Sequence, residues 1–548
     1  MEIETFKKLE KEALKKSRTD FGRLGLALFF MIAVLTYSFL SNGELTNNLF
    51  LAVAALIGAY MAMNIGANDV ANNVGPAVGS KAMTMSMAII IAAIFEASGA
   101  LIAGGEVVKT IKKGIIDISA FGGNSDAFIW AMMAALLAAA LWLNFATAMK
   151  APVSTTHSIV GGVMGAGIAA AGFNIVSWST MAKIAASWVI SPLLGGIIAA
   201  TFLYAIKRTI VFKEDKIHAA KTYVPIFVAL MSWAFVTYLT LKGLKKIWPQ
   251  VVEILNFIPL LSIEMSKKPS LLTALTLGFV AAIIVYIVVK KRLSTNNTTL
   301  ENSKASVNTL FTIPLVFAAA LLSFAHGAND VANAVGPLAA INDAVLNGGI
   351  SSKASIPIWV MAVGGLGIAI GLALYGPKLI RTVGSEITDL DQIRAFSIAM
   401  AASITVIIAS QLGLPVSSTH IAIGGVFGVG FLREYLHLTD KTNTIEEDKI
   451  FLEDEKAKLQ SYKIELKKLK TKNDKTEKDY KTIVELFQRI EHEEKLVKSA
   501  KKHIKRVKKV QYVKRDAIKK IVAAWLITVP AAAILAGLLF FTIKGIML

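Results

Sequence analysis

The sequence predicts an all-α polytopic membrane protein with about 12 transmembrane helices in two inverted repeats, some of them broken or re-entrant, and a soluble helical hairpin insertion. Three observations lead to this prediction. Hydrophobic residues make up 55% of the 548 residues and charged residues only 18%, so long uncharged apolar runs recur. Two motifs each occur twice, in the same order. A charged segment of helical periodicity interrupts the apolar pattern near the C-terminus.

The composition narrows the functional classes. A net charge of +20 would suggest nucleic acid as the partner of a soluble protein, but membrane proteins gather basic residues in cytoplasmic loops. The chain has no cysteine, which excludes disulfides, thiolate metal sites and cysteine nucleophiles. It also has no GxxxxGK[ST] loop and no recognisable nucleophile–base arrangement. We therefore expect neither an ATP-driven pump nor an enzyme, and no cofactor.

Apolar stretches close to the length of about 20 residues that a spanning helix needs recur along the chain. The first follows a basic segment, is too long for a signal-peptide core and is predicted to be a membrane helix with its N-terminus in the cytoplasm. Stretches 155–172 and 417–433 are short or rich in Gly and Pro, which is typical of broken or re-entrant segments. The thirteen stretches lie near 22–40, 48–66, 83–103, 127–148, 155–172, 183–206, 222–241, 272–290, 310–327, 356–375, 395–412, 417–433 and 521–543.

The charged segment has a different character. From about 438 to 520 it is dense in Lys, Glu and Asp, and apolar residues recur at helical spacing on both sides of a polar break at Thr471–Asp479. This pattern predicts a soluble, coiled-coil-like helical hairpin. Its basic end, Lys501–Lys520, together with Lys207–Arg208 and Lys290–Arg292, predicts that these parts face the cytoplasm. A solvated spacer and a partner-binding arm both fit the hairpin.

Two duplicated motifs establish the repeat. GANDVANNVGP at Gly66–Pro76 returns as GANDVANAVGP at Gly327–Pro337, with ten of eleven positions identical at an offset of 261. PVSTTHSIVGG from Pro152 returns as PVSSTHIAIGG from Pro415 at an offset of 263. Two motifs at nearly one offset indicate duplication. Because seven apolar stretches separate the starts of the two modules, an odd number, we predict that the repeats are inverted.

These patterns divide the chain into six predicted parts. The repeats carry the motifs, and the hairpin separates the second repeat from the last membrane helix. The parts are a basic segment with the first membrane helix at 1–47, transmembrane repeat 1 at 48–206, connecting loops and membrane helices at 207–309, transmembrane repeat 2 at 310–437, the charged hairpin at 438–520 and the final membrane helix at 521–548.

The motifs place unusual chemistry inside a membrane. A carboxylate at that depth is unfavourable unless it lines a polar cavity or has a partner, and Gly and Pro beside Asp69 and Asp330 predict interrupted helices there. The Pro-Val-Ser motifs indicate helix N-termini, whose free N–H groups and hydroxyls can hold an anion without Arg or Lys. Capping alone would explain either copy by itself, but the pairing of both copies with an Asn-Asp break favours ligand binding.

Carboxylates repel an anion unless something lies between them. A cation can bridge, because Asp, Asn and hydroxyl oxygens are hard ligands that suit an alkali ion. Alternatively, the anion can carry its own protons and donate them. Phosphate keeps at least one P–OH near neutral pH whereas sulfate keeps none, so a site lined by Asp favours phosphate over sulfate.

Three further titratable residues stand out. Glu96 lies in an otherwise apolar helix and is a candidate for binding a cation or a proton, although a hydrogen bond at a helix contact would also account for it. The corresponding helix of the second half has no Glu, so the two modules differ chemically. His157 and His420 follow the hydroxyl clusters; we expect each to form hydrogen bonds near its helix end, and no zinc site, because no Cys accompanies them.

The paired GANDVAN and PVS[ST]TH motifs resemble those of the inorganic phosphate transporter (PiT) family over roughly 48–206 and 310–433 and the last helix. The resemblance implies a multi-pass secondary symporter of the inner (plasma) membrane, often a homodimer, that imports phosphate with Na⁺ or H⁺. A sulfate permease of the same fold and a regulatory membrane protein are alternatives. The implied phosphate ligands are Asp69, Asp330, Ser154, Thr155, Thr156, Ser417, Ser418 and Thr419. The implied cation or coupling residues are Asn68, Asn72, Asn329, Asn333 and Glu96.

Overall fold

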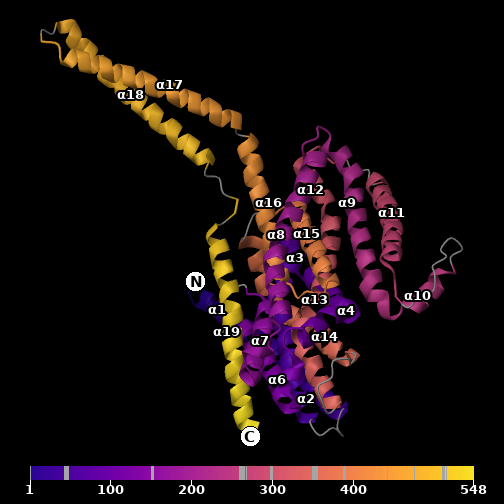
Figure 1. The fold of residues 1–548 in the computed structure, drawn as a ribbon. Helices are drawn as coiled ribbons and strands as arrows, with labels where there is room; N and C mark the ends of the chain where they lie inside the picture. Colours follow the sequence, from indigo (N-terminus) through magenta and orange to yellow (C-terminus); the bar gives the residue numbers. More distant parts are fainter. Residues whose placement is uncertain are drawn as a thin grey trace. The chain divides into compact units, whose positions relative to one another are not determined.

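The computed structural model describes residues 2–41, 48–149, 153–257, 266, 268–295, 300–347, 356–386, 390–440, 442–473, 476–508, 512–513 and 515–547. Within these ranges the fold is helical, with one isolated β-bridge and no strand (Figure 1). Eleven of the described helices are long and apolar enough to cross a membrane. The predicted all-α membrane fold is confirmed.

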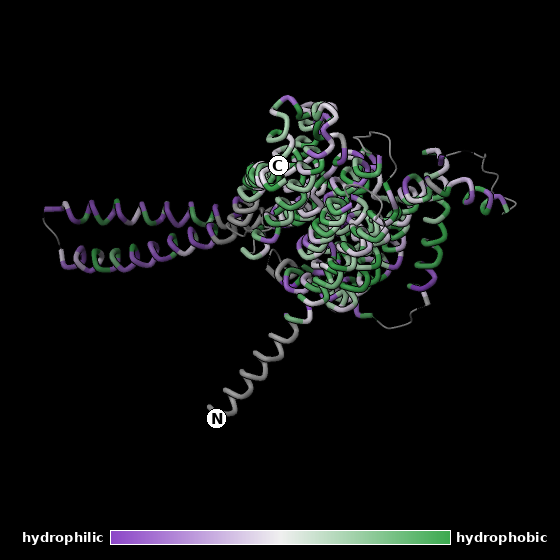
Figure 2. Tube along the Cα trace, turned by 90° about the horizontal axis from the view of Figure 1, so that it is seen from below, coloured by the Kyte–Doolittle hydropathy of each residue, from purple (hydrophilic) through white to green (hydrophobic). Residues whose placement is uncertain are grey.

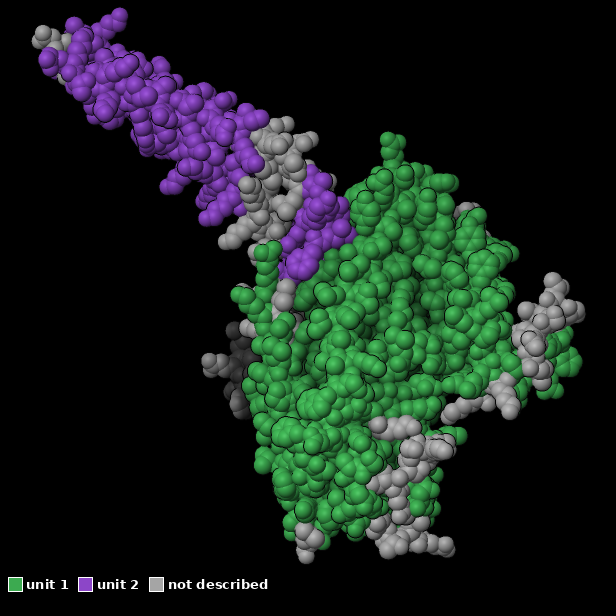
Figure 3. All heavy atoms as spheres, in the orientation of Figure 1, with its two compact units in different colours: residues 1–429, 515–548 green, residues 430–514 purple. Residues whose placement is uncertain are grey.

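The chain forms two compact units, residues 1–429 with 515–548 and residues 430–514 (Figure 3). Hydropathy distinguishes them, because the first unit is built mainly from hydrophobic helices and the paired helices of the second are mostly hydrophilic (Figure 2). Within the first unit, burial separates central from peripheral spans. In one span 89% of the most apolar stretch is buried inside the protein, whereas in another only 17% of that stretch is buried. These two spans are α13 (Thr312–Leu346) and the part of α11 (Leu271–Thr295) that ends at Ser294.

The first unit contains the helices of both repeats and the segment between them. The first repeat comprises α2 (Asn48–Asn68), α3 (Val70–Gly79), α4 (Met85–Ala103), α5 (Gly105–Lys113), α6 (Ser125–Ala148), α7 (Thr155–Ala171) and α8 (Trp178–Ile206). The second comprises α13, α14 (Ile358–Glu386), α15 (Gln392–Gln411), α16 (Ser418–Asp440) and α19 (Arg515–Met547). The other helices are α1 (Glu2–Ser41), α9 (Lys216–Tyr238), α10 (Trp248–Leu255), α11 (Leu271–Thr295) and α12 (Lys304–Leu310).

Reciprocal helix contacts relate the two repeats. A Cβ added at Gly66 would collide with the backbone oxygen of Ile368, and one added at Gly327 would collide with that of Glu96. Gly66 and Gly327 are equivalent in the duplicated motif, so Ile368 occupies the position of Glu96 at an offset of 272. A contact that recurs with the roles of the repeats exchanged is what a two-fold relation produces, and it agrees with the predicted inverted repeats.

The same reciprocity assigns the last helix. Gly161 and Gly165 of α7 approach the backbone of α19 at Val529 and Ala533. Their equivalents Gly424 and Gly428 of α16 approach the backbone of α8 at Pro192 and Gly196. Helix α19 is therefore the counterpart of α8 and completes the second repeat. The charged hairpin lies in the connection that corresponds to the short turn between α7 and α8.

Helices α6 and α7 form a hairpin whose two ends meet. Ile116, ahead of α6, pairs in a β-bridge with Val176, after α7, and Asp117 N donates to Ile175 O at 2.7 Å. The chain thus enters and leaves at one end of the bundle, while the start of α7 lies among buried residues. Because the hairpin returns to the end where it began, it does not change whether the number of crossings between the modules is odd, which agrees with the predicted inversion.

One detail of the sequence-based prediction is wrong. The first motif does divide α2 from α3 at Asp69, but the second lies inside the uninterrupted helix α13, which contains Pro337. No helix break accompanies Asp330. Backbone groups inside a membrane lack water as a partner, so a helix that can keep its hydrogen bonds does so.

The second unit contains the antiparallel pair α17 (Thr442–Lys470) and α18 (Glu477–Lys508), which lie side by side (Figure 1). Its core forms around Leu466, Leu486 and Ile490, and Lys463 Nζ lies 2.6 Å from Glu494 Oε1 across the pair. Core positions recur at alternating spacings of three and four, as in a coiled coil. They are Leu452, Glu455, Leu459, Tyr462, Leu466 and Leu469 in α17, and Ile483, Leu486, Ile490, Glu493, Val497, Ala500 and Ile504 in α18. The predicted helical hairpin is confirmed.

The close helix contact at Gly165 generates a stability prediction. Gly165→Ala places a methyl group against the Ala533 backbone and should lower the free energy of unfolding by about 1–3 kcal/mol. Gly537→Ala is the matched control, because its nearest neighbour lies at an ordinary 3.7 Å. Thermal unfolding of both purified variants measures the difference. Equal melting temperatures would contradict the contact.

Candidate functional site

The predicted site residues converge in the interior of the first unit. Asp69 lies between α2 and α3, Asp330 lies in the middle of α13, and the starts of α7 and α16 bring the hydroxyl clusters to them. All of these side chains are buried, Asp69 being 2% exposed and Asp330 0%. The tertiary structure therefore assembles motifs from both repeats into one polar cluster.

Asp69 is held by hydroxyls from both repeats. Thr155 Oγ1 donates to Asp69 Oδ2 at 2.7 Å, and Thr419 Oγ1 donates to Asp69 Oδ1 at 3.1 Å. Thr155 belongs to the same repeat as Asp69, whereas Thr419 belongs to the other. The carboxylate thus joins the first turns of α7 and α16. A carboxylate buried inside a membrane protein needs such hydrogen-bond partners from the protein.

Asparagines link the repeats in a reciprocal way. Asn72 Nδ2 donates to Thr419 Oγ1 at 2.9 Å, and its equivalent Asn333 donates to Thr156 Oγ1, the equivalent of Thr419, at 3.2 Å. Asn333 Nδ2 also lies 3.1 Å from Thr155 Oγ1. Each repeat therefore supplies amide donors to the hydroxyls of the other, which fixes both helix starts at the centre.

The remaining predicted residues shape the loops that precede those helices. Asn68 Nδ2 donates to Val153 O at 3.3 Å, and Asn329 Oδ1 accepts from the equivalent Val416 N at 3.3 Å. Ser154 and Ser417 accept from the backbone N–H three residues later and so cap α7 and α16. In this conformation the capping interpretation holds for these two serines. The first turns of these helices lie at the cluster, and the first N–H groups of a helix have no partner within the helix.

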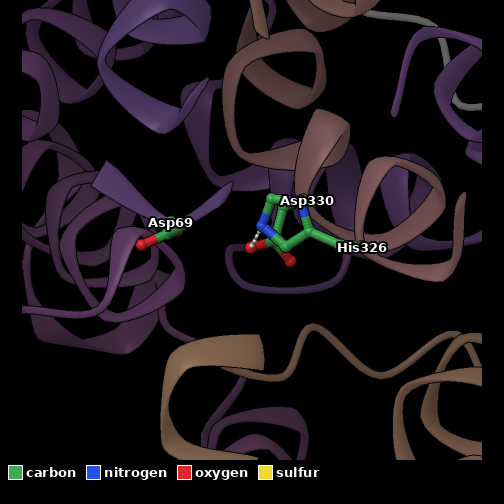
Figure 4. Close-up of side chains that lie close together, drawn as sticks. All are labelled: Asp69, His326 and Asp330. Carbon is green, nitrogen blue, oxygen red and sulfur yellow. Dashed lines mark ion pairs between the residues drawn. The ribbon is translucent and has the colours of Figure 1, made fainter. Parts of the chain in front are cut away.

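Asp330 belongs to a second network that includes a histidine. Ser418 Oγ donates to Asp330 Oδ2 at 3.2 Å, and His326 Nε2 lies 2.9 Å from the same oxygen (Figure 4). The other ring nitrogen, Nδ1, lies 2.6 Å from Glu96 Oε2, while Asn73 Nδ2 donates to Glu96 Oε1 at 2.7 Å. The imidazole thus lies between two carboxyl groups, with one at each ring nitrogen.

This second network has no counterpart in the other repeat. At the offsets fixed by the motifs and the glycine contacts, His326, Glu96 and Asn73 correspond to Ile65, Ile368 and Ala334. The sequence analysis noted the missing second Glu but overlooked His326 and Asn73. The available signal was a histidine four residues before Asp330 in an apolar helix, on the same helical face.

His157 and His420 meet where the repeats touch. Their ring centroids are 4.5 Å apart, and each ring lies against a tryptophan, Trp188 for His157 and Trp525 for His420. Within the described residues neither ring nitrogen of either histidine has a hydrogen-bond partner. Aromatic packing therefore surrounds both imidazoles at this contact.

The cluster leaves acceptors available for a ligand. Asp330 Oδ1, Asn73 Oδ1 and Asn333 Oδ1 are buried without a hydrogen-bond partner in the described structure. Ligand atoms of Asp69, His326 and Asp330 lie within 4.8 Å of one another. Because both nitrogens of His326 already face carboxylates, a bound cation would use oxygen atoms, as hard ions do. The arrangement can hold a small cation, or an anion that brings protons or a cation with it.

Comparison with known proteins agrees with this geometry. The sequence profile of the phosphate transporter family matches residues 65–536. A relative from Helicobacter pylori strain J99, named "Putative phosphate permease", is 49% identical over 98% of both chains. One of the same description from Pyrococcus abyssi is 39% identical over 70% of this chain and 89% of its own. A solved structure, the sodium-dependent phosphate transporter, matches with a TM-score of 0.69 at 29% identity, covering 90% of this chain and 99% of that chain. This chain belongs to the phosphate transporter family.

Proposed function

We propose that this protein is a secondary active transporter that imports inorganic phosphate across the inner membrane by symport with Na⁺ or H⁺. The observation that carries the proposal is the convergence of two buried aspartates and two helix N-termini from opposite repeats in one occluded cluster. A site built where two inverted repeats meet is open to alternate sides when the repeats rock against each other. The family and its permeases support a transport function.

The donor and acceptor balance favours phosphate. The hydroxyls of Thr155, Thr156, Ser418 and Thr419 and the helix N-termini supply donors to phosphate oxygens. Asp69 and Asp330 supply acceptors for P–OH groups, which sulfate lacks at neutral pH. In the conformation described here the hydroxyls already donate to the aspartates or the backbone, so phosphate entry exchanges these bonds for bonds to the ligand.

The oxygen atoms around the aspartates support Na⁺ as the coupling ion. Asn73 Oδ1, Asn333 Oδ1 and Asp330 Oδ1 are neutral or anionic oxygens without partners, and a hard monovalent cation prefers such ligands. The sodium-dependent phosphate transporter that matches this fold points the same way. The contact between Glu96 and His326 offers a proton-binding alternative, with Glu96 as the coupling residue in either case.

Transport by the purified protein in proteoliposomes tests substrate and coupling together. We expect labelled phosphate to accumulate when an inward Na⁺ gradient is imposed, and excess unlabelled sulfate to leave uptake nearly unchanged, because it cannot donate to the aspartates. A pH gradient without Na⁺ is the matched condition for proton coupling. Equal competition by sulfate would replace the proposal with the sulfate permease.

Conservative substitutions of the aspartates test the site. Asp69→Asn and Asp330→Asn keep the side-chain volume but replace an acceptor oxygen by a donor, so each should lower phosphate uptake at least about tenfold. Asp117→Asn is the control, because Asp117 is exposed and accepts only from Ser119. Initial uptake rates normalised to the amount of folded protein measure the effect. Near-normal rates in either site variant would remove that aspartate from the site.

We also propose a homodimer whose hairpin of residues 438–520 is cytoplasmic and accessory to transport. The motivation is the family resemblance and a hairpin that is compact by itself within residues 430–514. Replacing residues 442–508 by a short flexible linker should leave phosphate uptake intact. Light scattering of the purified protein tests the homodimer and should give twice the mass of one chain. Loss of uptake in the folded deletion variant would instead favour a regulatory role.

A further inference from the structure

A buried ion pair lies well away from the polar cluster. Lys112 Nζ and Asp343 Oδ2 are 2.8 Å apart, with side chains only 6% and 4% exposed. Asn347 Nδ2 donates to the other oxygen, Asp343 Oδ1, at 2.8 Å. The two charges come from α5 and from the last turns of α13. Nothing in the proposed phosphate site uses this pair, although burying two charges is unfavourable without a strong mutual attraction.

Its position is one end of the central helix. Asp343 is thirteen residues after Asp330 in the same unbroken helix, which is about 20 Å along its axis. One turn further, Leu346 and Asn347 are exposed. On the other side of α5, Thr110 Oγ1 donates to Gly413 O at 2.7 Å, in the loop before the second Pro-Val-Ser motif. Helix α5 therefore connects the end of α13 to the loop that shapes the site.

The ion pair has no equivalent when the roles of the two repeats are exchanged. The motif offset of 261 makes Ala82 the equivalent of Asp343. The offset of 272, fixed by the reciprocal glycine contacts, makes Gly384 the equivalent of Lys112. Neither Ala82 nor Gly384 carries a charge. In a pair of inverted repeats equivalent positions lie at opposite ends of the substrate path, so this ion pair belongs to one end and has no equivalent at the matching position of the other.

We propose that Lys112 and Asp343 form a conformational latch that keeps one of the two ends of the transport path closed until α5 and the end of α13 separate. The ion pair stabilises the closed end while it is intact, and each charge becomes hydrated when the end opens. Breaking it thus exchanges a buried attraction for hydration, which keeps both states accessible. At the opposite end the equivalent positions, Ala82 and Gly384, are uncharged, so opening there does not break an equivalent of this pair. This inference rests on the proposed transport function and specifies its gate.

The absence of cysteine from the chain makes the latch directly measurable. A single introduced cysteine is the only thiol, and a water-soluble maleimide reports its accessibility. Ala344→Cys places a thiol beside Asp343, where the native side chain is 2% exposed; we call it the latch thiol. Met83→Cys places one at the equivalent position of the other repeat, where the native side chain is 6% exposed; we call it the opposite thiol. Labelling is followed in nanodiscs, so both ends meet the reagent, and without phosphate or Na⁺.

Two sets of variants give opposite expectations. Lys112→Met leaves Asp343 buried without its cation, so the end of α13 should open more often and the latch thiol should label about tenfold faster, while the opposite thiol labels more slowly. Lys112→Met combined with Asp343→Leu removes both charges and the hydration that favours opening. In this apolar pair the latch thiol should label more slowly than in the otherwise native protein, and the opposite thiol faster.

The reciprocal change distinguishes a latch from a merely structural ion pair. If Lys112→Met unfolds the protein, both thiols label rapidly and the size-exclusion elution profile broadens. The test then rests on the double variant Lys112→Met with Asp343→Leu. Unchanged labelling of the latch thiol in the folded double variant would overturn the proposal, as would a parallel change at both thiols. Because labelling is measured without phosphate, failure here leaves the proposed substrate intact, and failure of phosphate uptake leaves the labelling result standing.

Discussion

The structure depends on satisfying carboxylates that cannot reach water. Asp69 and Asp330 are buried, and in the described structure the groups that hold them are hydroxyls and one imidazole of the protein. Such donors have to arrive from several helices, because one helix presents few polar groups on a single face. The requirement explains why the starts of α7 and α16 lie at the centre of the first unit, and why asparagines of each repeat contact hydroxyls of the other.

Two-fold pairing also explains the close helix contacts. Glycines at equivalent positions allow backbones to approach where larger residues would collide, and they recur in both repeats. The pairing shows that α19 is the counterpart of α8, although the charged hairpin separates α19 from the rest of its repeat in the sequence. An insertion in a connection between two helices can leave the packed helices unchanged, because connections tolerate insertions better than the elements they join.

Although the two repeats share their architecture, several charged residues occur in one repeat only. Glu96, His326 and Asn73 add a charged network beside Asp330 and leave Asp69 with hydroxyl partners only. Lys112 and Asp343 add a buried ion pair at one end of α13. Alternation between two ends needs an architecture that can open to either side, and the inverted repeats provide it. The direction of secondary transport follows the ion gradient. The charged residues present in one repeat only are therefore candidates for coupling.

The sequence by itself determined the membrane class, the duplication and most of the candidate site, because apolar runs and motifs at one offset are local or repetitive signals. It could not reveal His326 or Asn73 as partners of Glu96, since 230 positions separate His326 from Glu96. Nor could it show that α13 continues through its motif while the first copy divides two helices. Only the tertiary structure decided these points, because they depend on which donors from distant helices reach a buried carboxylate, and pairing at that distance leaves no periodic trace in the chain.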